Sequence, residues 1–422
     1  MGEGTVSRAG AMAAEVVKKR CFLCVGGYEP IDPAWSHQRF ARELDRFQKT
    51  WNVTAETSNP VASDKDGLAA WKIDTRGKNW HTETDFVLLR WDDFVIADFA
   101  RSNLERVPRG ILALGDFIVS GAAYRYMRTS IRYFFFFLYP FVLLAALAGL
   151  AVAIPYVLAR LGLPVPAPVA ALLSIALFVG GLYWPGRFFL IHYLLDDWIF
   201  AYELVHRTRP GLDQRIDCFA RELVEHARDR AYDEVVVSGH SLGGALMMEI
   251  VDRALKLDPS LGKRGPVLWL MSTGSSLLKI ALHPKAEWIR EATGRVADAP
   301  GVNWVEYQAI VDVISFYKTD PVVEMGLPDR ERPIVQQVKI RRMLEPATYK
   351  RYWGNFFRMH RQFGMGNELR YFYDYFQICC GPAPLARRVA ERDRLLAAFA
   401  EDGSYDGGEA PAKAAAGARA GG

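Results

Sequence analysis

The chain has 422 residues, of which 50% are hydrophobic and 24% are charged, and its formal net charge is +4. This length is sufficient for a large buried core or for two domains. The net charge is small and no basic stripe with interleaved aromatic residues occurs, so nucleic-acid binding is not predicted.

Residues 1–18 are predicted to be a mobile leader, and residues 19–25 a buried strand. Cys21 and Cys24 have C-x-x-C spacing within this strand, but alternation along a strand places the two thiols on opposite faces. No second cysteine pair follows at metal-binding spacing, so neither a metal site nor a cofactor is predicted. The odd total of five cysteines favours a reducing compartment.

The segment that follows the first strand alternates between helical and extended patterns. Residues 35–49 have helical spacing, residues 50–57 and 85–91 are predicted strands, and residues 92–128 carry amphipathic helical patterns. Residues 19–132 are therefore predicted to form the N-terminal part of an α/β domain.

Residues 133–186 contain a single charged residue, Arg160. Two apolar segments, 133–159 and 168–191, each reach the ~20 residues that a bilayer requires. The turn between them is rich in proline and glycine, which break helices. A transmembrane helical hairpin is therefore predicted over residues 133–191. Two alternatives remain open: a hairpin buried in a soluble core, and a hairpin that lies in one leaflet.

Arginines flank this hairpin on both sides. They are Arg125, Arg128 and Arg132 before it, and Arg187, Arg207 and Arg209 after it. Basic residues favour the cytoplasmic side of a membrane. The sequence thus predicts a protein with two spans whose soluble portions and termini are cytoplasmic. No secretory signal is predicted, because the first twenty residues lack an apolar segment of the needed length.

The most informative motif is Gly239-His240-Ser241-Leu242-Gly243, which follows the apolar run 235–237 and precedes a helical run from Gly244. This pattern predicts a strand, a sharp turn with Ser241 at its apex, and a helix, which is the context that a G-x-S-x-G nucleophile requires. Small flanking residues let the strand and helix pass closely, and the helix N-terminus can stabilise a developing oxyanion. His240 is predicted to be a turn residue that points away from the site.

The rest of the C-terminal half continues the alternation. Residues 213–230 are a predicted helix, and residues 267–271 and 302–310 are predicted strands. Residues 192–402 are therefore predicted to complete a single α/β domain with a largely parallel sheet, into which the hairpin is inserted. The Gly/Ala-rich residues 403–422 are predicted to be a disordered tail.

A nucleophilic serine needs a base, and the base needs an orienting acid. If these follow in the order serine, acid, histidine, only His283 and His360 are available after Ser241. The acid is expected after a late strand, at Asp312 or Asp320. Either position leaves His360 as the only histidine downstream, and His283 is then predicted to be a loop residue.

The choice between the two acids rests on their local context. Asp312 follows the end of a predicted strand, where a rigid element can aim it, whereas Asp320-Pro321 has the pattern of a turn or helix start. Asp312 is favoured, and both remain open.

The oxyanion hole is expected to combine the backbone N–H of Leu242 with one from the loop after the first strand. Gly26-Gly27-Tyr28 is the candidate loop, with Gly27 and Tyr28 as donors. Glycine there would let the backbone approach a substrate closely.

The segment 239–244 resembles the nucleophile elbow of α/β-hydrolase lipases, especially those of the class 3 type. Asp312-Val313-Ile314 is similar to the acid segment of that family, and His360 matches its late histidine. This resemblance, which covers four short segments, implies an α/β-hydrolase fold with a mostly parallel central sheet. It also implies ester hydrolysis through an acyl-enzyme. The hairpin departs from secreted members of the family.

The predicted function is therefore that of a membrane-associated serine hydrolase acting on a lipid or another acylated amphiphile. One alternative is an acyltransferase or thioesterase that uses the same triad. The spacing between His192 and Asp197 is also found in glycerolipid acyltransferases. The other alternative is a catalytically silent membrane scaffold. The sequence does not indicate whether the protein has protein partners.

Overall fold

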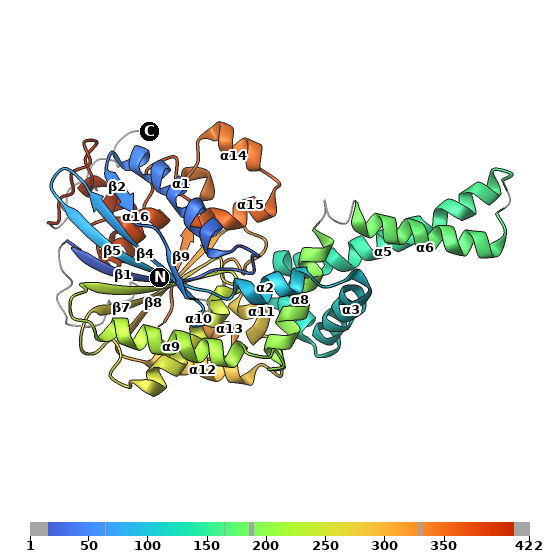
Figure 1. Cartoon of the computed structure of the whole chain (residues 1–422), viewed down its shortest axis with the longest axis horizontal. Helices are drawn as coiled ribbons and strands as arrows, with labels where there is room; N and C mark the ends of the chain where they lie inside the picture. Colours follow the sequence, from blue (N-terminus) through green and yellow to red (C-terminus); the bar gives the residue numbers. More distant parts are fainter. Residues whose placement is uncertain are drawn as a thin grey trace, which may run out of the picture.

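The computed structural model describes residues 16–408, apart from 64, 164, 185–189, 328, 329 and 331. Figure 1 shows a layered α/β body from which a pair of helices projects as an arm. Most of the predicted leader and tail, residues 1–15 and 409–422, lies outside the described residues. The first part of the predicted tail is described, and its Tyr405 bridges to Phe399.

A mixed sheet of nine strands forms the centre of the body, in the order β2-β4-β5-β1-β6-β7-β8-β9, with β3 paired to β4. The strands are β1 (Lys19–Val25), β2 (Thr54–Thr57), β3 (Val61–Ser63), β4 (Leu68–Arg76), β5 (His81–Leu89), β6 (Glu234–His240), β7 (Val267–Thr273), β8 (Val302–Ala309) and β9 (Ile334–Val338). Along the run β5-β1-β6-β7-β8-β9, each strand is parallel to its neighbours. The strand β4 pairs antiparallel with β2, β3 and β5. The prediction of an α/β fold with a mostly parallel sheet is confirmed.

Helices cover both faces of the sheet (Figure 1). One face carries α2 (Asp92–Phe99), α3 (Asn103–Val119), α4 (Ala122–Thr129), α8 (Ile191–Val205), α9 (Leu212–Arg228), α10 (Gly243–Leu257), α11 (Leu277–Ala281), α12 (Glu287–Asp298) and α13 (Pro321–Glu324). The other carries α1 (Pro33–Trp51), α14 (Pro346–Tyr352), α15 (Phe356–Arg361), α16 (Tyr375–Cys380) and α17 (Leu385–Glu391), with three short 3-10 turns. Val235 and Val237 of β6 enter one core and Val236 the other, as alternation along a doubly covered strand requires.

Two predicted element boundaries were wrong for identifiable reasons. Residues 50–51, predicted as strand, instead end α1, and Asn52 closes that helix in the left-handed conformation at φ 53°. The strand predicted at residues 85–91 begins earlier, at His81, because it pairs along its whole length with β4, which was not predicted.

The arm consists of α5 (Ile131–Arg160) and α6 (Ala167–Tyr183). Its base is anchored in the body, because Tyr133, Phe137 and Leu144 of α5 belong to the core cluster beneath the sheet. Farther along, the two helices pack against each other (Figure 1). A Cβ atom added to Gly181 would lie 2.1 Å from Leu147 Cδ1, so a larger residue there would require the Leu147 side chain to move.

Within the described part of the chain, α5 is the one helix that is long and apolar enough to cross a membrane. Its 30 residues extend over about 45 Å, more than the ~30 Å of a bilayer core. The 17 residues of α6 extend over only about 26 Å, and the predicted second span continues beyond this helix into residues 185–189. The two-span hairpin therefore stays a prediction.

Candidate active site

The residues predicted to form the site come from loops at one edge of the sheet. β1, β6, β7 and β8 are neighbouring parallel strands, and Gly27, Ser241, Gly274 and Asp312 follow their carboxyl ends. In open α/β sheets this edge is where ligands bind. His360 reaches it from α15, in the helical layer above the sheet.

Ser241 occupies the sharp turn between β6 and α10 in a left-handed conformation, with φ 55°. Its neighbours must be glycines. A Cβ atom on Gly239 would lie 2.8 Å from the Cα of Gly244, and one on Gly243 would lie 2.3 Å from the carbonyl oxygen of Val25. The predicted strand, turn and helix are thus confirmed, and the glycines have the packing role that was expected of them.

Asp312 and His360 form a buried pair, with 2.9 Å between Asp312 Oδ2 and His360 Nδ1. The carboxylate also accepts hydrogen bonds from Ser315 Oγ at 2.6 Å and from the Ile314 N–H at 3.0 Å. Burial alone would raise the pKa of Asp312, but His360 and these donors outweigh it, and the pKa lies below its usual value. The anionic carboxylate therefore holds the proton of His360 on Nδ1.

The other ring nitrogen of His360 is available as a base. Nε2 is buried and makes no hydrogen bond to any described residue. The hydrogen bond expected between Ser241 and His360 is thus not formed in this structure. Catalytic hydrogen bonds are often long before a substrate binds, and a buried nitrogen without a partner is unusual enough to require an explanation.

The structure separates the two candidate acids. Asp320 is the N-cap of α13, where its Oδ1 accepts the backbone N–H groups of Val322 at 2.9 Å and Val323 at 3.3 Å. Of the two acids, only Asp312 contacts His360. His283 lies in the loop after α11, as predicted, and contacts Asp116 rather than the site.

The sequence predicted that His240 points away from the site, and this prediction was wrong. Its ring centroid lies 4.6 Å from that of His360, and its Nε2 is 3.1 Å from the carbonyl oxygen of His360. Burial, and then the charge of His360, lower the pKa of His240 to about 3, so the neutral ring donates this hydrogen bond. The prediction failed because it considered only the turn, whereas His360 arrives from a helix 120 residues later.

The backbone groups proposed for the oxyanion hole lie around Ser241. Leu242 immediately precedes α10, and a Cβ atom on Gly27 would lie 3.1 Å from Ser241 Cβ. Among the described residues, the backbone N–H groups of Gly27, Tyr28 and Leu242 donate no hydrogen bond. The Tyr28 side chain is buried, and its hydroxyl donates to Asp98 Oδ2 at 2.8 Å. Only the backbone of Tyr28 therefore remains for an oxyanion.

A pocket of about 130 Å³ neighbours this site; Gly27 and His240 contribute to its lining, whereas Ser241, Asp312 and His360 do not. One wall is aromatic: Phe40, Trp71, Phe86 and Phe376. The other wall is charged: Glu29 accepts a hydrogen bond from Arg39 at 2.7 Å and forms an ion pair with Arg361 at 2.7 Å. Although burial opposes it, these two arginines lower the pKa of Glu29 to about 2. The pocket thus joins an apolar surface to a charged one.

Comparison of the chain with protein-family models, with curated proteins and with solved structures finds no match. The molecule is an α/β protein whose mostly parallel sheet is compatible with the α/β-hydrolase fold. Any narrower assignment depends on the residues of the site itself.

We predict that replacing His240 with glutamine, which can still donate to the His360 carbonyl, reduces the loss of stability on acidification. Because the pKa of folded His240 is about 3, the unfolded chain binds a proton that the folded chain does not once the pH falls below about 6.5. The free energy of unfolding therefore falls as the pH is lowered from about 6.5 towards the pKa of folded His240, about 3.

Urea unfolding in detergent at pH 7.5 and pH 5 measures this loss, which should be smaller in His240→Gln by about 1–2 kcal/mol. His37→Gln is the control, since it removes another half-buried histidine whose ring contacts a backbone carbonyl. Equal acid sensitivity in wild type and His240→Gln would contradict the prediction.

Proposed function

We propose that this protein is a membrane-associated serine hydrolase, similar to a lipase or esterase, that cleaves carboxylic esters of a lipid or another acylated amphiphile. The observation that carries the proposal is the strained conformation of Ser241 at the same sheet edge as the buried Asp312–His360 pair. A left-handed non-glycine residue costs about 1–3 kcal/mol, and such strain concentrates at functional sites.

In the proposed reaction, Ser241 Oγ bonds to the ester carbonyl carbon while its proton passes to His360 Nε2. The backbone N–H groups of Leu242 and Gly27 stabilise the resulting oxyanion. Collapse of this intermediate breaks the bond to the alcohol, which leaves with the proton from His360. Water, deprotonated by the same nitrogen, then bonds to the acyl carbon; the bond to Ser241 Oγ breaks, Oγ takes the proton back from His360, and the carboxylic acid is released. Asp312 keeps the imidazole in the required tautomer throughout.

The pocket supports an amphiphilic substrate, because its aromatic wall can take an apolar group and its charged wall a polar one. The resemblance of the elbow, acid and histidine segments to class 3 lipases points to the same chemistry. Transfer of the acyl group to an acceptor other than water, or cleavage of a thioester, would use the same residues and is the main alternative.

Two other candidate functions are less well supported. The spacing of His192 and Asp197 favours an acyltransferase of another type, but Asp197 is paired with the buried ammonium group of Lys279. A catalytically silent scaffold gives no reason for an unpaired buried Nε2 on His360 at the same sheet edge as a strained serine.

We infer that the arm inserts into a membrane. Along α5 and α6, large apolar side chains are exposed: Leu150, Val152, Val157, Leu172, Ile175 and Val179. In water such a continuous apolar surface is unfavourable, and it is typical of membrane or protein contact. Arg125, Arg128 and Arg132 lie at the base of the arm, which favours a cytoplasmic body. Both a spanning hairpin and one confined to a leaflet fit these observations.

A fluorophosphonate probe, which labels activated serines, is expected to react at Ser241. Ser241→Ala should lose the label and at least ~10³ in esterase rate, because the nucleophile is gone. Ser36→Ala, which alters a serine of the neighbouring pocket, should keep the label. Equal labelling of Ser241→Ala, located by mass spectrometry, would end the serine-hydrolase proposal.

Asp312→Asn is expected to lower kcat on a short acyl ester by about 10⁴, because the amide no longer fixes the tautomer of His360. Asp320→Asn changes a helix cap and should leave kcat within a few fold of wild type. Circular dichroism establishes that both variants fold. A larger loss in folded Asp320→Asn would overturn the assignment of the acid.

The membrane proposal predicts that the protein stays in the pellet after high-salt and carbonate washes, since neither weakens an apolar anchor. Placing arginine at both Leu172 and Ile175 should release part of it, as each charge costs about 2.5–3.5 kcal/mol at the centre of a span. Val61→Arg, an exposed apolar position on the body, is the matched control. Release of the wild type by carbonate would refute insertion.

A further inference from the structure

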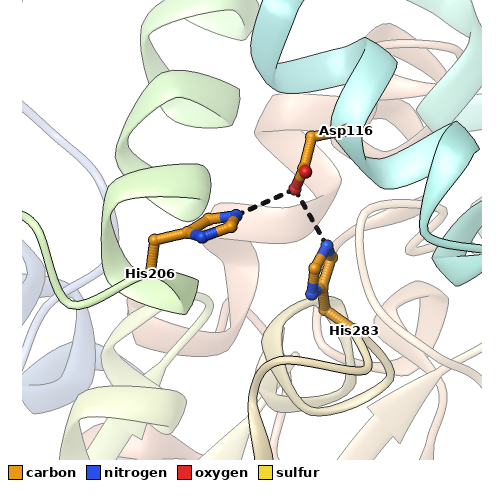
Figure 2. Close-up of side chains that lie close together, drawn as sticks. All are labelled: Asp116, His206 and His283. Atoms are coloured by element: carbon orange, nitrogen blue, oxygen red, sulfur yellow. Dashed lines mark hydrogen bonds and ion pairs between the residues drawn. The ribbon is translucent and has the colours of Figure 1, made fainter.

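Figure 2 shows the side chains of Asp116, His206 and His283 close together, with both imidazole rings directed at the Asp116 carboxylate. None of the three belongs to the candidate active site. Asp116 Oδ2 is 3.0 Å from His206 Nε2 and 2.9 Å from His283 Nε2. One ligand atom from each residue lies within 4.8 Å of the other two. The residues come from three elements: α3, the end of α8, and the loop between α11 and α12.

We propose that these three side chains bind one divalent transition-metal ion of the zinc class. Two imidazole nitrogens and one carboxylate oxygen are a donor set that Zn²⁺ takes readily, whereas Ca²⁺ and Mg²⁺ prefer oxygen ligands alone. Three protein ligands leave a fourth position for water. Asp116 and His206 are partly exposed, so that an ion can enter and keep this water.

The spacing of the donors suits a tetrahedral ion. Bonds of about 2.0 Å at the tetrahedral angle separate two donor atoms by roughly 3.3 Å. The observed separations from Asp116 Oδ2 are therefore only a few tenths of an ångström too short. The two imidazole centroids lie 5.7 Å apart, close to the roughly 5 Å expected for two histidines on one such ion.

The ligands are held in place by their surroundings. Tyr202 packs on the His206 ring at 4.3 Å between centroids, and Phe117 contacts the His283 ring edge-on at 5.0 Å. The loop that carries His283 is fixed by Arg290, which donates to the carbonyl oxygens of residues 281, 283 and 284. Such fixed side chains lose little freedom when an ion binds.

An ion would replace the two protons that now lie between the histidines and Asp116. Each proton would move to Nδ1 of its own ring, which is the usual form of a histidine bound through Nε2. For His283 this shift would break one hydrogen bond, because its Nδ1 now accepts the Lys285 N–H at 3.2 Å.

A second cluster of similar composition shows what the proposed site avoids. Asp74, His81 and Glu83 also place their ligand atoms together, but all three are solvent-accessible. Arg76 donates to Asp74 Oδ1 at 2.8 Å, so a cation already uses that carboxylate. This exposed cluster carries no proposal and supplies a control.

The proposed ion would link three elements that are separate in the sequence. Helix α3 precedes the arm along the chain and α8 follows it, while the loop after α11 belongs to the body. Binding would thus tie α3 and the C-terminal end of α8 to the loop after α11. This inference rests on the fold alone and does not require the protein to be a hydrolase.

The test uses the full chain without a histidine tag, purified in detergent, stripped with a chelator and titrated with Co²⁺ or Zn²⁺. We expect one ion per chain, the strong visible absorption of tetrahedral Co²⁺, and a Tm raised by Zn²⁺. Less than one ion per chain, or a Kd weaker than about 100 µM, would overturn the proposal.

Asp116→Asn and His206→Gln should each weaken binding at least ~10-fold, since each removes a ligand. Both positions are partly exposed, unlike that of His283, and are better suited to substitution. His81→Gln in the exposed cluster should bind as wild type does. Unchanged binding in both ligand variants would refute the site, and if neither variant folds, absence of the Co²⁺ absorption from wild type would do so.

Discussion

The tight turn at Ser241 is the constraint on which the candidate site depends. A strand and a helix pass so closely there that Cβ atoms at residues 239 and 243 would collide with backbone. The chain can make this turn only with a left-handed residue at its apex. The same turn places Ser241 beyond the sheet edge and beside the N-terminus of α10, where the Leu242 N–H donates no hydrogen bond to any described residue.

The rest of the site is arranged around this fixed point by long-range packing. Parallel pairing of β1, β6, β7 and β8 places the loops with Gly27 and Asp312 at the same edge as the serine. His360 comes from α15, in a helical layer that covers the sheet. His240, at the end of β6, contacts the His360 ring and forms a hydrogen bond with the His360 carbonyl oxygen. The arm joins the body on the other face of the sheet, in the cluster that also buries α10.

Features of the site that depend on a short stretch of sequence, or on the order of residues in the chain, could be predicted from the sequence. The elbow was recognisable from glycines within five residues, and His360 from its order in the chain. The strands β3, β4 and β9 were missed, because strand formation depends on packing against neighbouring strands as well as on residue type. The cluster of Asp116, His206 and His283 had no sequence signature at all, since it depends on how three separate elements pack.

An experimental structure of the protein with a phosphonate bonded to Ser241 would test the central claim most directly. The proposal predicts that the phosphonyl oxygen lies within hydrogen-bond distance of the Leu242 N–H and of the Gly27 or Tyr28 N–H, with His360 Nε2 facing the bonded Ser241 Oγ. A phosphonyl oxygen turned away from these donors, or His360 turned away from the serine, would contradict it.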